Sequence, residues 1–400
     1  MQHSDFQASS AFADSKPHLV LLDALRGIAA FMVIFYHVFE GFATSPQDQV
    51  WNHGYLAVDF FFVLSGFVIG YAYDERWQTT ANPAGTLSVK SFFLRRLIRL
   101  HPMVVVGTLI GLVTFLIQGG TQWDGTHVAW SSILLAIVLG CCMLPAVPGA
   151  PGEVRGNGEM FPLNGPAWSL FFEYIGNILY ALLLRRLPTR IIAALAVIFG
   201  IGLTAMAVTQ GYLGLGWSLS DLNVPGGLLR MLFSYTMGML LARWFHKKPK
   251  KNNTSFGANM AFVLSSIVLV LFTSMPYVGT AEIGWTDGIY DSFCVIVIFP
   301  SIVWLVARHS IGVALSEHTL SGATWFGNIS YPLYIVHYPF MYLFYYYVGF
   351  PNVKVAFEEV WYFGVLTIAV SLVVATLCLK YVDEPVRKYL SRRYLGQKRG

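Results

Sequence analysis

The chain has 400 residues, of which 56% are apolar and only 12% are charged. Soluble domains carry about 25% charged residues, so this composition excludes a soluble globular protein and predicts an integral membrane protein. The net charge of +5 arises mainly in loops and in the C-terminal tail, where it reports orientation in the bilayer, and we expect no nucleic-acid partner.

The chain begins with 18 polar residues, and an apolar run follows them. The polar stretch lacks a basic region, and the apolar run is too long for a signal peptide and has no small-residue cleavage site. We therefore expect a cytoplasmic tail at residues 1–18, one transmembrane domain at 19–382 and a basic cytoplasmic tail at 383–400.

The first apolar run holds two polar residues that are costly in a lipid-facing helix. Arg26 and His37 are eleven residues apart, which is three turns plus roughly 20°, so they share one helical face about 16 Å apart. Alone, Arg26 could snorkel to the membrane surface and His37 could be a structural hydrogen-bonding residue. Their shared face favours a polar cavity beside the helix, with His37 as a catalytic base.

Asp59 stands at the start of the second apolar run, at a depth similar to that of His37. It is either the N-cap of this helix or a carboxylate that orients the His37 imidazole. In the same run, the spacing of Gly66 and Gly70 is typical of close helix packing.

Two arginines precede the third apolar run. Arg96 and Arg99 are at i and i+3, on one helical face, near other basic residues. Such a cluster marks a cytoplasmic loop, or binds phosphate groups through the guanidinium forks, and the two interpretations are compatible.

Eleven apolar runs are long enough to cross a bilayer. They lie near residues 19–42, 55–73, 101–118, 131–147, 167–186, 190–209, 226–245, 257–275, 289–307, 325–349 and 360–381. Between Arg99 and Arg185 the chain must leave the cytoplasm and return, which takes an even number of crossings, yet three runs lie there. We expect the run at 131–147, which leads into a Pro/Gly-rich loop, to be partial or re-entrant. The prediction is an all-α membrane protein with about ten transmembrane helices, one partial segment and both termini in the cytoplasm.

Later runs carry further polar residues. Ser169 and Glu173 are at i and i+4 of one helix, and a buried glutamate is costly unless it is functional or paired. Trp168 beside them is also typical of a membrane interface. His337 lies in an aromatic cluster, where a structural hydrogen bond is the first interpretation. The four cysteines lie in apolar runs without metal-ligand spacing, so we expect buried thiols and no metal.

Five stretches, in order along the chain, resemble the acyltransferase-3 family of membrane-bound O-acyltransferases. They are LRGIAAFMVIFYH with Arg26 and His37, GYLAVDFFFVLSGFVI, RRLIRLHP with Arg96 and Arg99, PAWSLFFE, and SYPLYIVHYP. The second stretch has Ala57 where glycine is commoner, which is a mild departure. No SGNH-type domain follows, so the resemblance is to the stand-alone form of the family.

The resemblance implies transfer of an acyl group, usually acetyl, from cytoplasmic acyl-CoA to a hydroxyl of a carbohydrate or glycolipid at the far side of the membrane. It implies a bacterial cytoplasmic (inner) membrane and makes His37 the essential histidine. Together with the residue patterns, it predicts three groups of site residues. They are His37, Asp59 and Glu173 for catalysis, Arg26, Arg96 and Arg99 for acyl-CoA, and Trp168, Ser169 and His337 for the substrate.

Two chemical routes and two rival functions remain open at this point, and the weaker rival is a membrane scaffold without chemistry, which leaves the intramembrane ionisable groups unexplained. His37 acts as a general base on the acceptor hydroxyl, oriented by Asp59 or Glu173, or it is itself transiently acylated. The main rival is a polytopic transporter or flippase for a carbohydrate or lipid, in which the same charges line a pathway. A transporter would need no acyl-CoA, and the chain shows no internal repeat of the transporter kind.

Overall fold

The computed structural model describes residues 19–45, 47–77, 87–247, 253–279, 284–349 and 355–395. These residues form helices and connecting loops without an extended strand, which confirms the predicted all-α fold. The predicted tail at 1–18 and the last five residues of the predicted tail at 383–400 lie outside the described residues.

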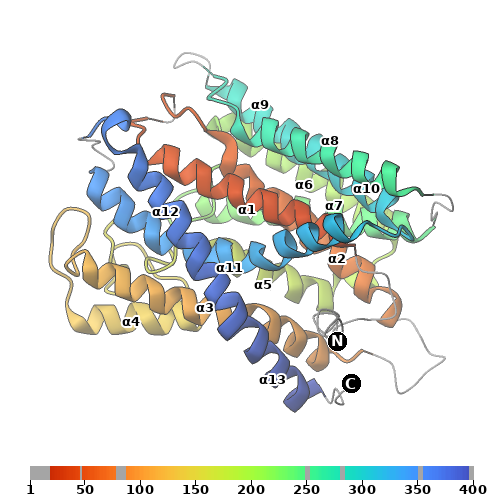
Figure 1. The fold of residues 1–400 in the computed structure, drawn as a ribbon, viewed down its shortest axis with the longest axis horizontal. Helices are drawn as coiled ribbons and strands as arrows, with labels where there is room; N and C mark the ends of the chain where they lie inside the picture. Colours follow the sequence, from red (N-terminus) through yellow and green to blue (C-terminus); the bar gives the residue numbers. More distant parts are fainter. Residues whose placement is uncertain are drawn as a thin grey trace.

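Long helices make up most of the described chain (Figure 1). They are α1 (Val20–Glu40), α2 (Ala57–Tyr73), α3 (Val89–Ile117), α5 (Ala167–Leu182), α6 (Thr189–Gln210), α7 (Asn223–Lys247), α8 (Ser255–Ser274), the consecutive α9 (Trp285–Phe293) and α10 (Phe299–Ser310), α11 (Glu317–Val348), and the consecutive α12 (Phe357–Cys378) and α13 (Glu384–Leu395). Within the described ranges, nine helical segments are long and apolar enough to cross a membrane.

The helix α11 is the tenth long segment, and it differs from the nine in composition. Its 32 residues extend about 48 Å, more than the ~30 Å hydrocarbon core of a bilayer. Ser330, Tyr334 and His337 lower its hydropathy, and all three are buried. Because α11 packs against α1, α3 and α12, these polar groups face protein and not lipid. The helix α11 corresponds to the predicted run at 325–349, and its polar residues keep it outside the nine apolar segments of the described ranges.

The predicted partial segment is a short helix. The helix α4 (Trp130–Cys141) has 12 residues and extends about 18 Å, which is too short to cross the hydrocarbon core. It packs along α3 (Figure 1), and its last turn leads into a long loop. The thiol prediction holds in part: all four cysteines are free, and Cys294 and Cys378 are buried, but Cys141 is half-buried and Cys142 is exposed.

Glycines allow α2 and α7 to cross closely. A Cβ atom on Gly66 would lie 2.1 Å from the Tyr235 carbonyl oxygen, and one on Gly238 would lie 2.1 Å from the Val63 carbonyl oxygen. Only hydrogen atoms fit between the two backbones at these points. The small-residue spacing predicted for α2 therefore serves helix packing.

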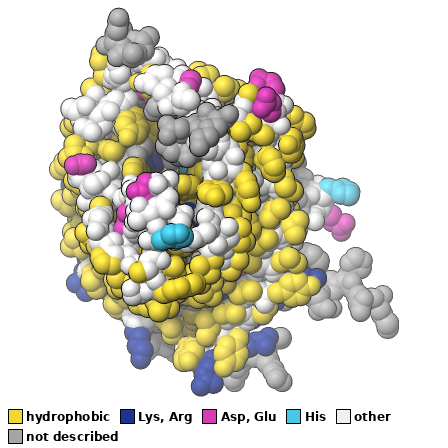
Figure 2. Space-filling view, turned by 90° about the vertical axis from the view of Figure 1, so that its left-hand side faces the viewer, with side chains coloured by type: hydrophobic (Ala, Val, Ile, Leu, Met, Phe, Trp, Pro, Cys, Tyr) yellow, Lys and Arg dark blue, Asp and Glu magenta, His cyan; other side chains and the backbone are white. Residues whose placement is uncertain are grey.

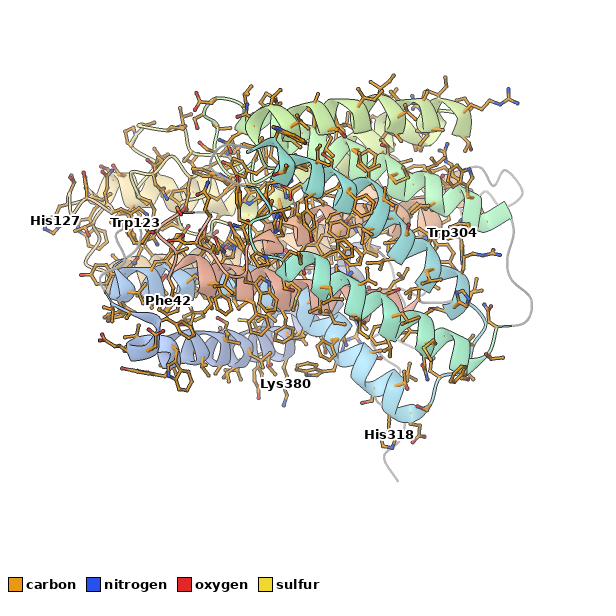
Figure 3. The ribbon with its side chains drawn as sticks, turned by 90° about the horizontal axis from the view of Figure 1, so that it is seen from above. Phe42, Trp123, His127, Trp304, His318 and Lys380 are labelled. Carbon is orange, nitrogen blue, oxygen red and sulfur yellow. The ribbon has the colours of Figure 1, made fainter. Side chains whose placement is uncertain are left out.

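The two ends of the helical body differ in charge. We call the end that carries Lys90, Arg186, Arg308 and Arg392 the basic end, where α3 begins and α5, α10 and α13 end. The opposite end carries His127 (Figure 3). Viewed face-on in Figure 2, this opposite end shows acidic side chains scattered over the surface, with Lys and Arg mainly at its lower margin.

Candidate active site

A cavity lies between α1, α2, α3, α5 and α11. Its wall on α2 is mainly apolar, with side chains such as Val58, Phe61 and Val68. Five of the nine predicted site residues line it, and the cavity is thus where most of the predicted site comes together. These five are Arg26, Arg96, Arg99, Ser169 and Glu173.

Two of the three cavity arginines are paired with carboxylates. Arg96 Nη2 donates to Glu173 Oε1 at 2.5 Å. Arg26 Nη1 lies 3.0 Å from Asp23 Oδ1, and its Nε donates to Ser330 Oγ at 2.9 Å. These partners hold both guanidinium groups in place and neutralise most of their charge.

Arg99 is the cavity arginine without a carboxylate partner among the described residues. It lies one helical turn from Arg96 on the same face of α3. Three guanidinium groups and the two carboxylates of Asp23 and Glu173 leave the cavity with one excess positive charge. An anion that enters the cavity therefore finds a fixed, uncompensated cation at Arg99.

An aromatic layer separates the cavity from His37. At the cavity wall, the hydroxyls of Tyr334 and Ser169 lie 2.7 Å apart. The next turn of α11 places the His337 ring 5.9 Å from that of Tyr334 and 5.7 Å from that of His37. Tyr338 packs edge-on against His37, with ring centroids 4.7 Å apart. His37 does not line the cavity itself.

His337 is buried completely within this layer. Its Nδ1 donates to the Leu333 carbonyl oxygen at 3.2 Å, which is the structural hydrogen bond expected for it. Its Nε2 is buried and has no hydrogen-bond partner among the described residues, so it is available to form a hydrogen bond. His337 accordingly stands between the cavity and His37.

His37 forms a pair with Glu40, one turn further along α1. Its Nδ1 lies 2.7 Å from Glu40 Oε2, and the Tyr345 hydroxyl donates to the same oxygen at 2.8 Å. A carboxylate only accepts hydrogen bonds, so Nδ1 carries a proton and the neutral imidazole keeps its lone pair on Nε2. The His37 side chain is 16% exposed, and Nε2 has no hydrogen-bond partner in the described part of the chain. This is the arrangement that a general base requires.

Asp59 does not contact His37, in contrast to the predicted pairing. Its carboxylate accepts two hydrogen bonds from Arg230 Nε at 3.1 Å and one from Arg230 Nη2 at 2.7 Å. Both side chains are buried, and Arg230 donates further to the carbonyl oxygens of Leu215 and Tyr55. The pair joins α2 to α7, and its polar atoms are satisfied away from the imidazole.

Glu173 and Trp168 also lie apart from His37. Glu173 accepts hydrogen bonds from Arg96 and from Ser65 Oγ, the latter at 2.8 Å, and both partners line the cavity. The Trp168 ring lies 5.1 Å from the Arg230 guanidinium and does not line the cavity. Glu173 is therefore not the carboxylate partner that the sequence suggested for His37.

Beyond Tyr338, a second polar network joins α11 to the loop after α4. The Arg155 guanidinium lies 3.5 Å from the centroid of the Tyr342 ring. Glu159 accepts hydrogen bonds from the Tyr342 hydroxyl and from Asn157 at 2.8 Å. Burial raises the pKa of Glu159, and its hydrogen bond with Tyr342 works against that shift. The network holds the last turns of α11 in place. Tyr338, which packs against His37, lies one turn before Tyr342 on this helix.

Two residues of this site were missed from the sequence. Glu40 is at i+3 from His37 on the same helix, and that spacing alone signals a contact. Arg230 lies within an apolar run, where an ionisable residue signals a function or a partner. Glu40, and not Asp59 or Glu173, is thus the carboxylate that pairs with His37.

The sequence of the chain matches a known protein family over most of its length. Residues 19–380 match the acyltransferase-3 family, which is described as an acyltransferase domain. The chain belongs to the acyltransferase-3 family. By that membership it is a membrane O-acyltransferase. The match to an acyltransferase domain thus favours an enzyme over the rival transporter.

Two curated relatives of this acyltransferase-3 chain differ in how much of their length it covers. "Protein 2 in picA locus" of Rhizobium radiobacter is 34% identical over 168 residues, which are 40% of this chain and 80% of that protein. Peptidoglycan O-acetyltransferase OatA of Listeria monocytogenes is 23% identical over 392 residues, which are 94% of this chain and 56% of that protein. The chain thus spans about half the length of OatA. No solved structure matches the chain.

Proposed function

We propose that this protein transfers an acetyl group from cytoplasmic acetyl-CoA to a hydroxyl of a carbohydrate or glycolipid on the far side of a bacterial inner membrane. One observation carries the proposal. A cavity with an excess positive charge lies near the basic end, and Arg26 of α1 lines it. Further along α1, beyond the cavity, lies His37, which is paired with Glu40. The acetyl group agrees with the name of the relative OatA, a peptidoglycan O-acetyltransferase.

The donor enters from the basic end, which is the cytoplasmic side in this proposal because Lys and Arg concentrate there. Coenzyme A carries phosphate groups on one end of a long, thin arm. Arg99 binds a phosphate, because no carboxylate among the described residues competes for its guanidinium, and Arg96 adds hydrogen bonds from within its pair with Glu173. The arm then lies along the apolar wall formed by Val58 and Phe61.

The thioester reaches His37 through the aromatic layer. Arg26 and His37 lie about 16 Å apart along one face of α1, so an extended arm bound at the arginines points toward the imidazole. Tyr334 and His337 stand on this line, and a change of the Tyr334 rotamer opens it when the donor binds. Ser169, which contacts Tyr334, holds that ring in its closed position.

Acyl transfer then follows from the His37–Glu40 pair. His37 Nε2 takes the proton from the acceptor hydroxyl, and the oxygen attacks the carbonyl carbon of the thioester. The carbon–sulfur bond breaks, and the coenzyme A thiolate takes the proton from the imidazolium. Glu40 stabilises the imidazolium that forms in between. Tyr36 and Tyr338 flank His37 and offer aromatic faces to a sugar ring.

The decisive experiment supplies labelled acetyl-CoA to membranes that contain the protein. We expect label in a carbohydrate-containing fraction, and we expect His37→Ala to abolish it while the protein still inserts into the membrane. His127→Ala is the matched control, because His127 is exposed at the opposite end and should leave the transfer intact.

Two outcomes would overturn the proposal. Normal label transfer by His37→Ala would remove the assigned base. Absence of transfer from acetyl-CoA, together with transfer from another acyl-CoA such as succinyl-CoA, would replace the acetyl group. Rapid trapping of a label on the wild-type protein itself, lost in His37→Ala, would favour the acyl-histidine route over direct attack.

A further inference from the structure

A second cluster of chemically active side chains lies at the opposite end, away from the cavity. It consists of His53, which precedes α2 in a short 3-10 turn (His53–Leu56), and of Asp287 and Asp291 on α9. Their exposed fractions are 0%, 1% and 0%. The two aspartates are at i and i+4, so they share the face of α9 that meets the turn.

The hydrogen bonds around this cluster fix the state of the imidazole. His53 Nδ1 lies 2.9 Å from the Met275 carbonyl oxygen, and a carbonyl only accepts, so Nδ1 carries a proton. Nε2 therefore points at the two aspartates, 3.2 Å from Asp287 Oδ1 and 3.6 Å from Asp291 Oδ1. A histidine whose far nitrogen donates to a backbone carbonyl is oriented as metal-ligating histidines are.

Three buried atoms of the cluster lack hydrogen-bond partners within the described ranges. They are His53 Nε2, Asp287 Oδ2 and Asp291 Oδ1. The other carboxylate oxygens are bonded: Asp287 Oδ1 accepts from the Val278 amide, and Asp291 Oδ2 accepts from the Tyr55 hydroxyl and the Leu213 amide. A proton on Nε2 would satisfy at most one of these acceptors, whereas one cation can take Nε2 and one oxygen of each carboxylate as ligands.

The geometry points to a divalent metal ion held by His53, Asp287 and Asp291, with Zn²⁺ as the ion that suits this ligand set best. One imidazole and two carboxylates form a nitrogen and oxygen donor set that Zn²⁺ accepts. Zinc bonds of about 2.0–2.2 Å place neighbouring ligand atoms roughly 2.8–3.6 Å apart. The separations of 3.2 and 3.6 Å from Nε2 fall in that range.

The ion would join three segments of the opposite end. His53 belongs to the turn before α2, the aspartates belong to α9, and the Met275 carbonyl that orients the imidazole follows α8. Tyr55, which donates to Asp291, also packs its ring 5.6 Å from that of Tyr36, beside His37. The proposed site therefore stabilises Tyr55 and Tyr36, which lie beside the His37–Glu40 pair. It departs from the expectation of no metal, and it does not depend on the acyl-transfer proposal.

The test measures metal in the purified full chain. The protein in detergent is dialysed against Zn²⁺ and then against metal-free buffer, and its zinc content is determined by mass spectrometry. We expect about one zinc per chain, near-complete loss in His53→Gln and in Asp287→Asn, and no loss in His309→Gln. His309 is the matched control because its Nδ1 bonds the Leu305 carbonyl oxygen of its own helix, α10, away from the cluster.

A second measurement needs no variant, in case the substitutions prevent folding. Wild-type protein loaded with Co²⁺ should show the visible d–d absorption of a bound ion, and excess Zn²⁺ should remove it. Stripping the metal with a chelator should lower the melting temperature by several degrees. Wild-type protein that retains no zinc or cobalt would overturn the proposal and leave His53 as an imidazolium. Equal zinc content in wild type, His53→Gln and Asp287→Asn would overturn the assignment of the ligands.

Discussion

At the scale of single residues, Glu40 is the partner that fits His37 for proton transfer. We predict that Glu40→Gln lowers kcat about 100-fold, because the amide cannot stabilise the imidazolium and permits the wrong tautomer. The KM for acetyl-CoA should change little, since Glu40 lies away from the cavity. Steady-state kinetics of the purified protein measure both quantities.

The matched control for this substitution is Glu359→Gln. Glu359 is an exposed glutamate at the start of α12. It should keep wild-type kcat. A Glu40→Gln variant with wild-type kcat would show that the carboxylate is not needed to orient the base.

Arg99 is the residue on which donor binding depends most in the proposed mechanism. We predict that Arg99→Lys raises the KM for acetyl-CoA about tenfold and leaves kcat nearly unchanged, because a point charge replaces a bidentate fork. Arg186→Lys, an exposed arginine at the basic end, is the control. An unchanged KM in Arg99→Lys would mean that Arg99 serves orientation in the membrane and not binding.

The residues of the site were predictable in part, and the reason is visible in two of them. The spacing of Arg26 and His37 gave their shared face, because helix geometry is local and regular. The partner of Asp59 was not predictable, because Arg230 is 171 residues away in sequence and only the packing of α2 on α7 brings them together. Local patterns specify which residues share a face, and tertiary packing selects their partners.

At the scale of elements, the crossing of α2 and α7 is the contact with the least room. We predict that Gly66→Ala destabilises the fold by about 1–3 kcal/mol, because the added methyl group would collide with the Tyr235 backbone. Thermal unfolding of the purified protein in detergent should show a lower melting temperature. Gly322→Ala in α11 is the control, since no described atom lies within 4 Å of the place that its methyl group would occupy.

The melting temperatures of the two variants separate packing from helix propensity. Alanine favours a helix over glycine at both positions. Gly322→Ala should therefore melt at or above the wild-type temperature. Equal melting temperatures for the two variants would mean that α2 and α7 can separate without cost.

Helix existence was more predictable than helix length or role. Loop charges correctly singled out the run at 131–147, because an odd number of crossings conflicts with the basic loops on both sides. The helix α11 was predicted from its apolar run at 325–349, although buried polar residues such as Ser330 and His337 keep it outside the nine apolar segments. From sequence alone, polar residues within such a helix look like those of a loop. Only the neighbouring helices show that these residues are buried in protein.

At the scale of the whole molecule, the proposed orientation predicts which end is reached from outside the cell. In a Cys142→Ser background, we predict that His127→Cys reacts with a membrane-impermeant maleimide in intact cells. His318→Cys should react only after the cells are opened. The two histidines are exposed, and they lie at opposite ends in Figure 3. The reverse labelling pattern would invert the proposed direction of acyl transfer.

The aromatic layer of Tyr334, His337 and Tyr338 bears on the ion gradients of the cell. A membrane potential of 100 mV amounts to about 2.3 kcal/mol for each elementary charge that leaks across. The cavity arginines and His37 lie on opposite sides of a layer in which His337 is completely buried. An acyl group crosses this layer without charge, so the proposed reaction can supply the far side while the bilayer remains electrically sealed. Vesicles that contain the protein should hold a proton gradient as long as empty ones do.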